Sequence, residues 1–160
     1  MKSIKYLLIC FLSCIYATNS VAQCDHPDYE GLMEFYNATN GDNWVNNDGW
    51  GDTSTDCDPC KWYGVICKNN RVIELFLDNN GMTGTLPDLD LDSLAVLRLF
   101  QNKIGGSIPN FSKAKKLRNM ALTSNIFEGS LPNFDSLAKL EIINLSYNLL
   151  SGTIPDFNNC

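Results

Sequence analysis

The phrase LFLDNNGMTGTLP, which runs from Leu75 to Pro87, decides the fold because the chain repeats it four times. The other copies are LRLFQNKIGGSIP from Leu97, MALTSNIFEGSLP from Met120 and INLSYNLLSGTIP from Ile143. The prolines that close the four phrases follow one another at intervals of 22, 23 and 23 residues. Self-similarity at a fixed period of about 20–50 residues predicts a solenoid of stacked repeats.

Each phrase opens with two apolar residues separated by one position, which puts both side chains on one face of a short strand. Stacked repeats would lay these strands in parallel and merge their apolar faces into one core. The pairs are Leu75 and Leu77, Leu97 and Leu99, Met120 and Leu122, and Ile143 and Leu145. Further inward positions are predicted at Met82, Ile104, Phe127 and Leu150, and at Leu86, Ile108, Leu131 and Ile154.

An asparagine follows each predicted strand, at Asn80, Asn102, Asn125 and Asn148. The chain leaves the strand there, and buried backbone N–H and C=O groups need partners. An amide side chain offers both a donor and an acceptor. The recurrence therefore predicts a structural ladder of asparagines rather than four binding residues.

The residues before the repeats predict a cap. Tyr29, Leu32, Met33 and Tyr36 give residues 28–37 the apolar face of a helix. Trp44 and Trp50 lie in an Asn-, Asp- and Gly-rich stretch and need a core. Alternation of Tyr63, Val65 and Cys67 predicts a strand that begins the sheet. A solenoid needs a covered end, so residues 23–70 are predicted to form that cap and 71–160 the repeats.

Residues 1–22 are predicted to be a secretory signal peptide. Lys2 and Lys5 precede an apolar run over 6–16 that is too short to span a bilayer, and Ser20-Val21-Ala22 offers small residues before a cleavage site. A lipid anchor at Cys14 or Cys24 is the less favoured alternative, because neither cysteine follows suitable small residues.

Five cysteines would remain in the exported chain: Cys24, Cys57, Cys60, Cys67 and Cys160. Disulfides are the usual state of cysteines outside the cell, but spacing alone leaves three pairings open for the four in the cap. A zinc site made of Cys57, Cys60, Cys67 and His26 is the alternative, disfavoured by the signal peptide. The acidic run of Asp52, Asp56 and Asp58 is interpreted as a solvated loop, because it lacks the glycine and distal glutamate of a helix–loop–helix calcium site.

Charge and motif content narrow the function. Loss of two lysines with the leader would move the formal net charge from −6 to −8, which argues against nucleic-acid binding. His26 is the one histidine, and no nucleophile motif, metal cluster or phosphate loop stands out. The sequence therefore predicts a non-catalytic protein with no cofactor and no transmembrane segment.

The pattern L-x-L-x-x-N-x-L-x-G-x-I/L-P resembles the plant-type leucine-rich repeat, and the upstream helix with Asn-Gly-Asp-Asn-Trp and Cys-x-Trp-x-Gly-Val-x-Cys resembles its N-terminal cap. The resemblance implies a right-handed solenoid arc with a parallel concave sheet and a second layer of strands beside the Gly-x-Ile-Pro segment. It also implies the pairs Cys24–Cys57 and Cys60–Cys67. Members of the family include receptor-like kinase ectodomains, inhibitors of secreted polygalacturonases, and secreted bacterial or protist proteins.

Binding is the activity that such proteins share, so the resemblance implies a secreted or cell-surface module for a protein or glycan ligand. Inhibition of a secreted polysaccharide hydrolase and a truncated copy of a longer receptor or adhesin are the alternatives. The array is short and ends within a repeat. Residues 156–160 are interpreted as a minimal cap, as the end of a truncated copy, or as an end that a partner covers. Cys160, which has no predicted disulfide partner, is interpreted as a buried thiol or as an intermolecular contact.

The predicted ligand site lies on the outward positions of the concave strands. Aromatic residues and arginine dominate binding energy at interfaces, and both occur there. The predicted residues are Phe76, Asp78, Arg98, Phe100, Gln101, Asn144 and Tyr147. Three N-glycosylation sequons begin at Asn37, Asn110 and Asn144, and a glycan on Asn144 would cover part of this face.

Overall fold

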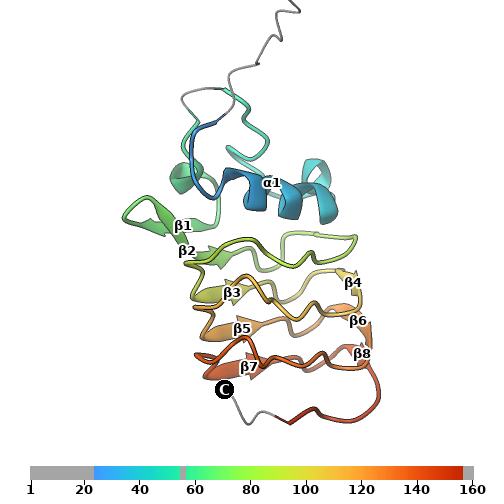
Figure 1. Ribbon diagram of the computed structural model, residues 1–160. Coiled ribbons are helices and arrows are strands. Elements are labelled where there is room, and N and C mark those ends of the chain that lie inside the picture. Colours follow the sequence, from blue (N-terminus) through green and yellow to red (C-terminus); the bar gives the residue numbers. More distant parts are fainter. Residues whose placement is uncertain (1–23, 55–56, 157–160) are drawn as a thin grey trace, which may run out of the picture.

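A computed structural model describes residues 24–54 and 57–156. The helical cap lies at one end of a stack of coils, and each coil contributes one strand to the same side of the stack (Figure 1). The predicted signal peptide, Asp56 and Cys160 lie outside the described residues. No helix of the described chain combines the length and the apolar character that a membrane crossing requires.

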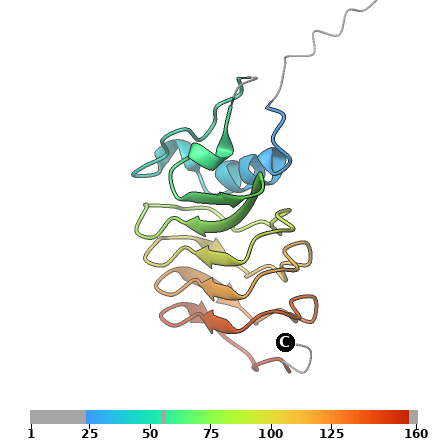
Figure 2. The same ribbon diagram turned by 90° about the vertical axis from the view of Figure 1, so that its left-hand side faces the viewer.

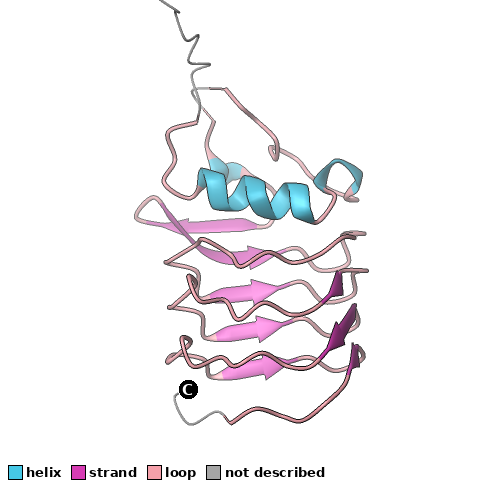
Figure 3. Cartoon of the chain, turned by 45° about the vertical axis from the view of Figure 1, so that its right-hand side comes forward, coloured by secondary structure: helices cyan, strands magenta, loops and turns pink. Residues whose placement is uncertain are grey.

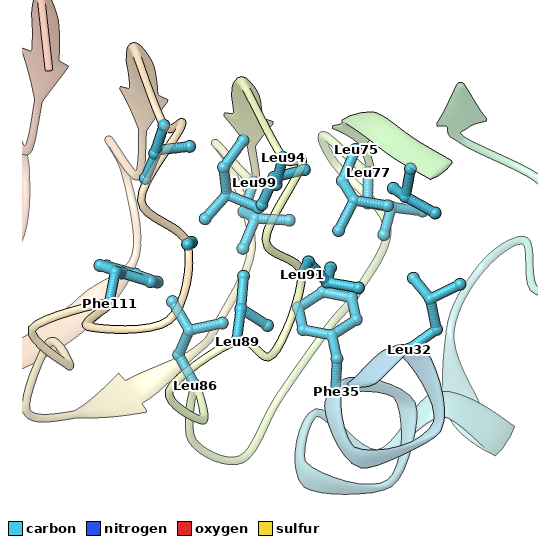
Figure 4. Close-up of a cluster of buried hydrophobic side chains, with 14 of the residues drawn as sticks. Leu32, Phe35, Leu75, Leu77, Leu86, Leu89, Leu91, Leu94, Leu99 and Phe111 are labelled. Atoms are coloured by element: carbon cyan, nitrogen blue, oxygen red, sulfur yellow. The ribbon is translucent and has the colours of Figure 1, made fainter. Parts of the chain in front are cut away.

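Helix α1 (Tyr29–Ala38) confirms the predicted helix, shifted by one residue. Its buried face uses Leu32 and Phe35, which are fully buried and point toward Leu91 of the first coil (Figure 4). Met33, which the periodicity placed on this face, is only partly buried. The helix approaches the first coil so closely at Gly31 that a Cβ there would lie 2.6 Å from the carbonyl oxygen of Asp90.

Indole rings fill the rest of the cap, between the short 3-10 helices η1 (Gly41–Asn43) and η2 (Pro59–Lys61). The Trp50 ring lies 5.0 Å from Trp44 and 5.0 Å from Trp62, measured between centroids. Both of the predicted core indoles also find hydrogen-bond acceptors, because Trp44 Nε1 donates to Thr39 and Trp50 Nε1 donates to Tyr63. The burial predicted for Trp44 and Trp50 is confirmed.

The larger sheet has the order β1-β2-β3-β5-β7 (Figure 2). Its strands are β1 (Val65–Lys68), β2 (Arg71–Phe76), β3 (Val96–Arg98), β5 (Asn119–Ala121) and β7 (Ile142–Asn144). The four repeat strands are parallel and in register, with Leu75, Leu97, Met120 and Ile143 aligned. β1 pairs antiparallel with β2, and its register shifts between Ile66 and Cys67. Tyr63 precedes β1 and is 40% exposed, so the alternation predicted from Tyr63 begins only at Val65.

A second sheet lies on another side of the stack and contains β4 (Gly105–Gly106), β6 (Ile126–Gly129) and β8 (Leu149–Leu150) (Figure 3). Its strands are parallel, and an isolated bridge from Thr85 to Gly105 adds the first coil. This confirms the additional strand layer that the resemblance implied.

The inward positions form a continuous core through the first three repeats, where Leu75, Leu97 and Met120 are fully buried. The fourth repeat is different. Ile143 and Leu145 are only partly buried, and Ile154 is 78% exposed although its counterpart Ile108 is 3% exposed. The inward position predicted for Ile154 is therefore wrong, because each inward side chain is covered by neighbouring coils and the described residues place no further coil over this one.

The predicted asparagine ladder is confirmed. The Asn102 side-chain oxygen accepts the N–H groups of Asn80 and Met82 at 2.9 and 3.0 Å, and its amide nitrogen donates to the carbonyls of Leu77 and Leu99 at 2.9 and 3.0 Å. Asn125 and Asn148 make the same two kinds of donated bond one and two coils later, and their side-chain oxygens accept the N–H groups of Ile104 and Phe127. Each amide thus serves the backbone of its own coil and of the preceding one.

The first rung continues the ladder into the cap. Asn80 accepts the N–H of Asn46 at 2.8 Å and donates to the Asn46 carbonyl at 2.9 Å. Asn46 of the cap therefore gives Asn80 the hydrogen-bond partners that the preceding coil gives to the later asparagines.

An ion pair also joins the cap to the first coil. Asp28, which is 1% exposed, accepts hydrogen bonds from Nε and NH2 of Arg71 and, at 2.6 Å, from the N–H of Val72. Arg71 also contacts Asp92 at 2.6 Å. The hydrogen bonds to Asp28 raise the pKa of Arg71. Because Asp28 immediately precedes α1, this pair fixes the start of the helix against β2.

Replacing Asn102 by alanine should lower the free energy of unfolding by about 3 kcal/mol, because four buried backbone groups lose their partner. Asn148→Ala is the matched control. Asn148 is half-buried, so water can replace its amide, and we expect a loss of about 1 kcal/mol. Urea unfolding measures both values. Equal losses of unfolding free energy in the two variants would contradict the idea that an asparagine stabilises the ladder more when it is more deeply buried.

Asp28→Ala should destabilise the protein by about 3 kcal/mol, because it leaves the Arg71 guanidinium and the Val72 N–H without their buried acceptor. Asp92→Ala removes the exposed partner of the same arginine and should cost less than about 1 kcal/mol. Thermal and urea unfolding of the two variants test this difference. A cost of Asp92→Ala as large as that of Asp28→Ala would show that burial of Asp28 is not what matters.

Candidate ligand-binding site

Four of the seven predicted ligand residues come together on the outward face of the larger sheet. β2 ends at Phe76 and β3 ends at Arg98, and the two residues are paired across the strands. The Arg98 guanidinium carbon lies 4.8 Å from the centroid of the Phe76 ring and 5.3 Å from that of Phe100. Both distances allow a cation–π contact. Together with Asp78, these residues form the Arg98 cluster: Phe76, Asp78, Arg98 and Phe100.

Asp78 holds the guanidinium in place. Its carboxylate lies 2.6 Å from NH2 of Arg98 and also accepts the N–H of Phe100 at 3.3 Å. The Asp78 side chain is only 16% exposed, whereas that of Arg98 is 40% exposed. Loss of hydration raises the pKa of Asp78, and this effect outweighs the lowering by Arg98 and by the Phe100 N–H. The cluster thus presents an oriented, partly exposed cation.

The two phenylalanines of the cluster are half-buried. The interpretation of Phe76 and Phe100 as exposed aromatic anchors is therefore wrong in its simple form, because Arg98 lies over both rings. Among the predicted aromatic residues, Tyr147 is the one that is largely exposed, at 84%.

The other three predicted residues do not join the Arg98 cluster. Asn144 lies on β7, two strands from β3, which corresponds to roughly 10 Å. Its side-chain oxygen accepts a hydrogen bond from the Ser146 hydroxyl at 2.8 Å. Gln101 and Tyr147 occupy equivalent turn positions with left-handed backbones, at φ 57° and 54°. The predicted site therefore divides into the Arg98 cluster and a polar patch on the last repeat.

Small side chains separate the two parts. Ala121 lies between Arg98 and Asn144 in the strand register. Thr123, two residues further, donates to the Ser146 carbonyl at 2.8 Å. The middle of the face thus carries less side-chain bulk than the Arg98 cluster.

One row of the face was missed at the sequence level. Residues two positions before the first predicted row also point outward, and Ile142 among them is 56% exposed. The row contains Glu74, Val96, Asn119 and Ile142, and β1 adds Ile66 beside Glu74. Side chains alternate between the two faces of a strand, so this row could have been predicted by starting each predicted strand two residues earlier.

The cysteine cluster forms disulfides. Cys24 pairs with Cys57 and Cys60 pairs with Cys67, as the resemblance implied. His26, Cys60 and Cys67 do lie together, with their ligand atoms within 4.8 Å of one another. The two sulfurs are bonded to each other, however, so they are not available as the thiolates that zinc requires. The predicted zinc alternative, which also used Cys57, is therefore not supported.

The acidic run in the cap loop has local partners. Asp52 accepts the N–H of Ser54, and Asp58 contacts Lys61 at 3.0 Å. These contacts lower the pKa of both carboxyl groups. Their geometry is that of a solvated loop with its own hydrogen bonds.

Comparison with known proteins agrees with this architecture. The family model "Leucine rich repeat N-terminal domain" matches residues 25–68, and "Leucine Rich Repeat" matches residues 139–160. Phytosulfokine receptor 1 of Arabidopsis thaliana is 35% identical over 128 residues, which are 74% of this chain and 12% of that protein. This chain thus spans about an eighth of the length of that receptor.

Solved structures show the same fold. The ectodomain of the receptor kinase SOBIR1 from Arabidopsis thaliana matches with a TM-score of 0.62 and 27% identity over 80% of this chain and 70% of that one. The ectodomain of the Arabidopsis receptor kinase HAESA, in complex with a peptide hormone ligand, matches with a TM-score of 0.65 and 28% identity over 80% of this chain and 22% of that one. With its four in-register coils, its asparagine ladder and its disulfide-bonded helical cap, this chain belongs to the plant-type leucine-rich repeat family.

Proposed function

We propose that this protein is a secreted or cell-surface, non-catalytic recognition module that binds an extracellular protein or peptide on its concave sheet. The observation that carries the proposal is the Arg98 cluster, in which a cation is oriented by Asp78 and flanked by two aromatic rings. These four residues occupy outward positions of the sheet, which the leucine core beneath them does not require to be charged or aromatic. Arginine and aromatic residues are also the types that dominate interface energies.

The chemistry of the cluster favours a ligand with exposed oxygen acceptors. A guanidinium has five N–H donors in a planar fork, and Asp78 engages NH2 from one side. The Arg98 side chain is 40% exposed, so backbone carbonyls or a carboxylate of a ligand could reach its remaining donors. Asp78 already holds the Arg98 side chain in one orientation. Arg98 therefore loses less conformational entropy on binding a ligand than a free arginine would.

The rest of the face provides a path for an extended ligand. From Arg98 the sheet continues over the small side chains of Ala121 and Thr123 to the exposed Asn144 and Tyr147. A peptide that lies across the strands could contact both ends of this path. The similarity to the HAESA ectodomain, whose structure contains a peptide hormone, supports a peptide ligand. If the bound protein is a secreted hydrolase, binding on this face would inhibit that enzyme.

An extracellular location agrees with this proposal. Residues 1–22 have the features of a signal peptide, and the matched structures are receptor ectodomains. A glycan on the exposed Asn144 would cover the far end of the proposed path. Occupancy of the sequon at Asn144 would therefore restrict the ligand to the Arg98 cluster.

The triple variant Phe76→Ala, Arg98→Ala, Phe100→Ala should lose at least about tenfold in affinity, because it removes the cation and both aromatic contacts. Immobilised wild-type and variant proteins are incubated with the extracellular fluid of the source, and the retained proteins and peptides are identified and titrated. Lys113→Ala is the matched control, because Lys113 is exposed and contacts Asp90 away from the sheet face.

Circular dichroism confirms that the variants remain folded. Equal retention by the wild type and the triple variant would refute the site. Retention of polysaccharide alone, with loss in the triple variant, would identify a glycan ligand instead of a protein.

Replacing Asp78 by asparagine should raise the melting temperature above that of the wild type. This gain should be larger at pH 7 than at pH 3. The raised pKa of Asp78 means that the folded protein holds this proton more readily than the unfolded chain. The ionised carboxylate therefore lowers stability above its folded pKa, and this cost disappears as the pH falls through that value toward the ordinary pKa of 3.8.

Thermal unfolding at the two pH values measures the difference. Asp58→Asn is the control of opposite sign, because contacts lower the pKa of Asp58 and its ionised form adds stability that is lost on acidification. A larger relative gain of Asp78→Asn at pH 3 than at pH 7 would contradict the dominance of desolvation at this site.

A further inference from the structure

The one histidine of the chain lies against one end of a disulfide. His26 Nε2 is 3.4 Å from Sγ of Cys60. Its other ring nitrogen, Nδ1, accepts the N–H of Asp28 at 3.2 Å, so Nδ1 carries no proton and Nε2 of the neutral ring carries one. Asp28 is itself held by Arg71 and Val72, which fixes the backbone that sets this tautomer. The imidazole thus donates a hydrogen bond toward the Cys60 sulfur.

From this geometry we propose that the Cys60–Cys67 bridge is a thiol-exchange site, at which a low-molecular-weight thiol such as glutathione becomes attached to Cys67. The thiolate of the small molecule attacks Sγ of Cys67, and a new S–S bond forms there. The Cys60–Cys67 bond breaks, and its electron pair leaves with Cys60 as a thiolate. The Nε2–H group of His26 stabilises that thiolate by a hydrogen bond, and its proton remains on nitrogen.

The position of His26 makes the two sulfurs unequal. Thiol–disulfide exchange is faster when the leaving thiol has a lower pKa, and a hydrogen bond to the thiolate form lowers that pKa. Cys60 is the sulfur that receives this bond, so it is the better leaving group and Cys67 is the sulfur attacked. Both cysteines are half-buried, and in the other bridge Cys57 is half-buried while Cys24 is buried.

The surrounding fold can tolerate the opened bridge. Cys60 and Cys67 are separated by 7 positions, and the Cys24–Cys57 pair by 33. A shorter loop contributes less stability to the folded state. The segment between Cys60 and Cys67 also keeps noncovalent contacts, since Gly64 accepts the N–H of Phe76 at 2.8 Å and Trp62 is buried. The cap would therefore remain folded when this bridge is open.

The test uses the secreted protein with its free thiols first alkylated. Excess glutathione is added, samples are quenched with a second alkylating reagent at early times, and peptide mapping by mass spectrometry locates each modification. We expect Cys60–Cys67 to open before Cys24–Cys57, with glutathione on Cys67 and the second alkyl group on Cys60. Glutathione found equally on both cysteines, or mainly on Cys60, would overturn the proposal.

His26→Ala should slow the opening of Cys60–Cys67 by about tenfold, the loss expected for one hydrogen bond to a charged group, and should remove the preference for Cys67. His26→Gln retains an amide donor and should recover part of the rate. The opening rate of Cys24–Cys57 is the internal control and should stay unchanged in both variants. An unchanged rate for Cys60–Cys67 in His26→Ala would refute the role of His26. If His26→Ala unfolds, the Cys24–Cys57 rate reports it, and the position of glutathione in the wild type still decides the question.

Discussion

The need to satisfy buried backbone groups where the chain leaves each strand is the constraint on which this structure depends. One asparagine per coil meets it, and its amide reaches both its own coil and the preceding one. Because each amide binds two coils, it also fixes their relative height and register. The pairing of Asn80 with Asn46 extends the same solution into the cap, so the cap and the coils share one polar spine.

The register that this spine imposes also creates the candidate site. Phe76 and Arg98 are 22 positions apart, yet they are direct neighbours because Leu75 and Leu97 are aligned in the sheet. Each repeat uses its leucines and asparagine for the scaffold and leaves only the outward positions free to vary. The Arg98 cluster therefore adds an oriented cation to the face without disturbing the core beneath it.

The sequence allowed most of the scaffold to be predicted, because strand alternation and the asparagine position are local patterns that recur. It did not reveal contacts that depend on the packing of distant segments. The half-burial of Phe76 follows from the arginine of the next coil, and the Asp28–Arg71 pair joins residues 43 positions apart. Periodicity predicted Met33 on the buried face of α1, but Phe35 is the residue that is fully buried there. The difference arises because α1 packs on the first coil, and helical periodicity alone does not specify which side of the helix does so. The disulfide pairing came from family resemblance, since spacing left three pairings open.

The cap is held by two kinds of bond that act on different parts of it. Both disulfides join cap residues to each other, while the Asp28–Arg71 pair and the Asn46–Asn80 amide contacts join the cap to the coils. Opening a disulfide therefore leaves both connections to the solenoid intact. Because Asp28 both binds Arg71 and orients His26, the contact that docks the cap also sets the chemistry at the Cys60–Cys67 bridge. A change at Asp28 would consequently affect the docking of the cap and thiol exchange together. A change at His26 would act on exchange directly and on the cap only through the N–H of Asp28 that its ring accepts.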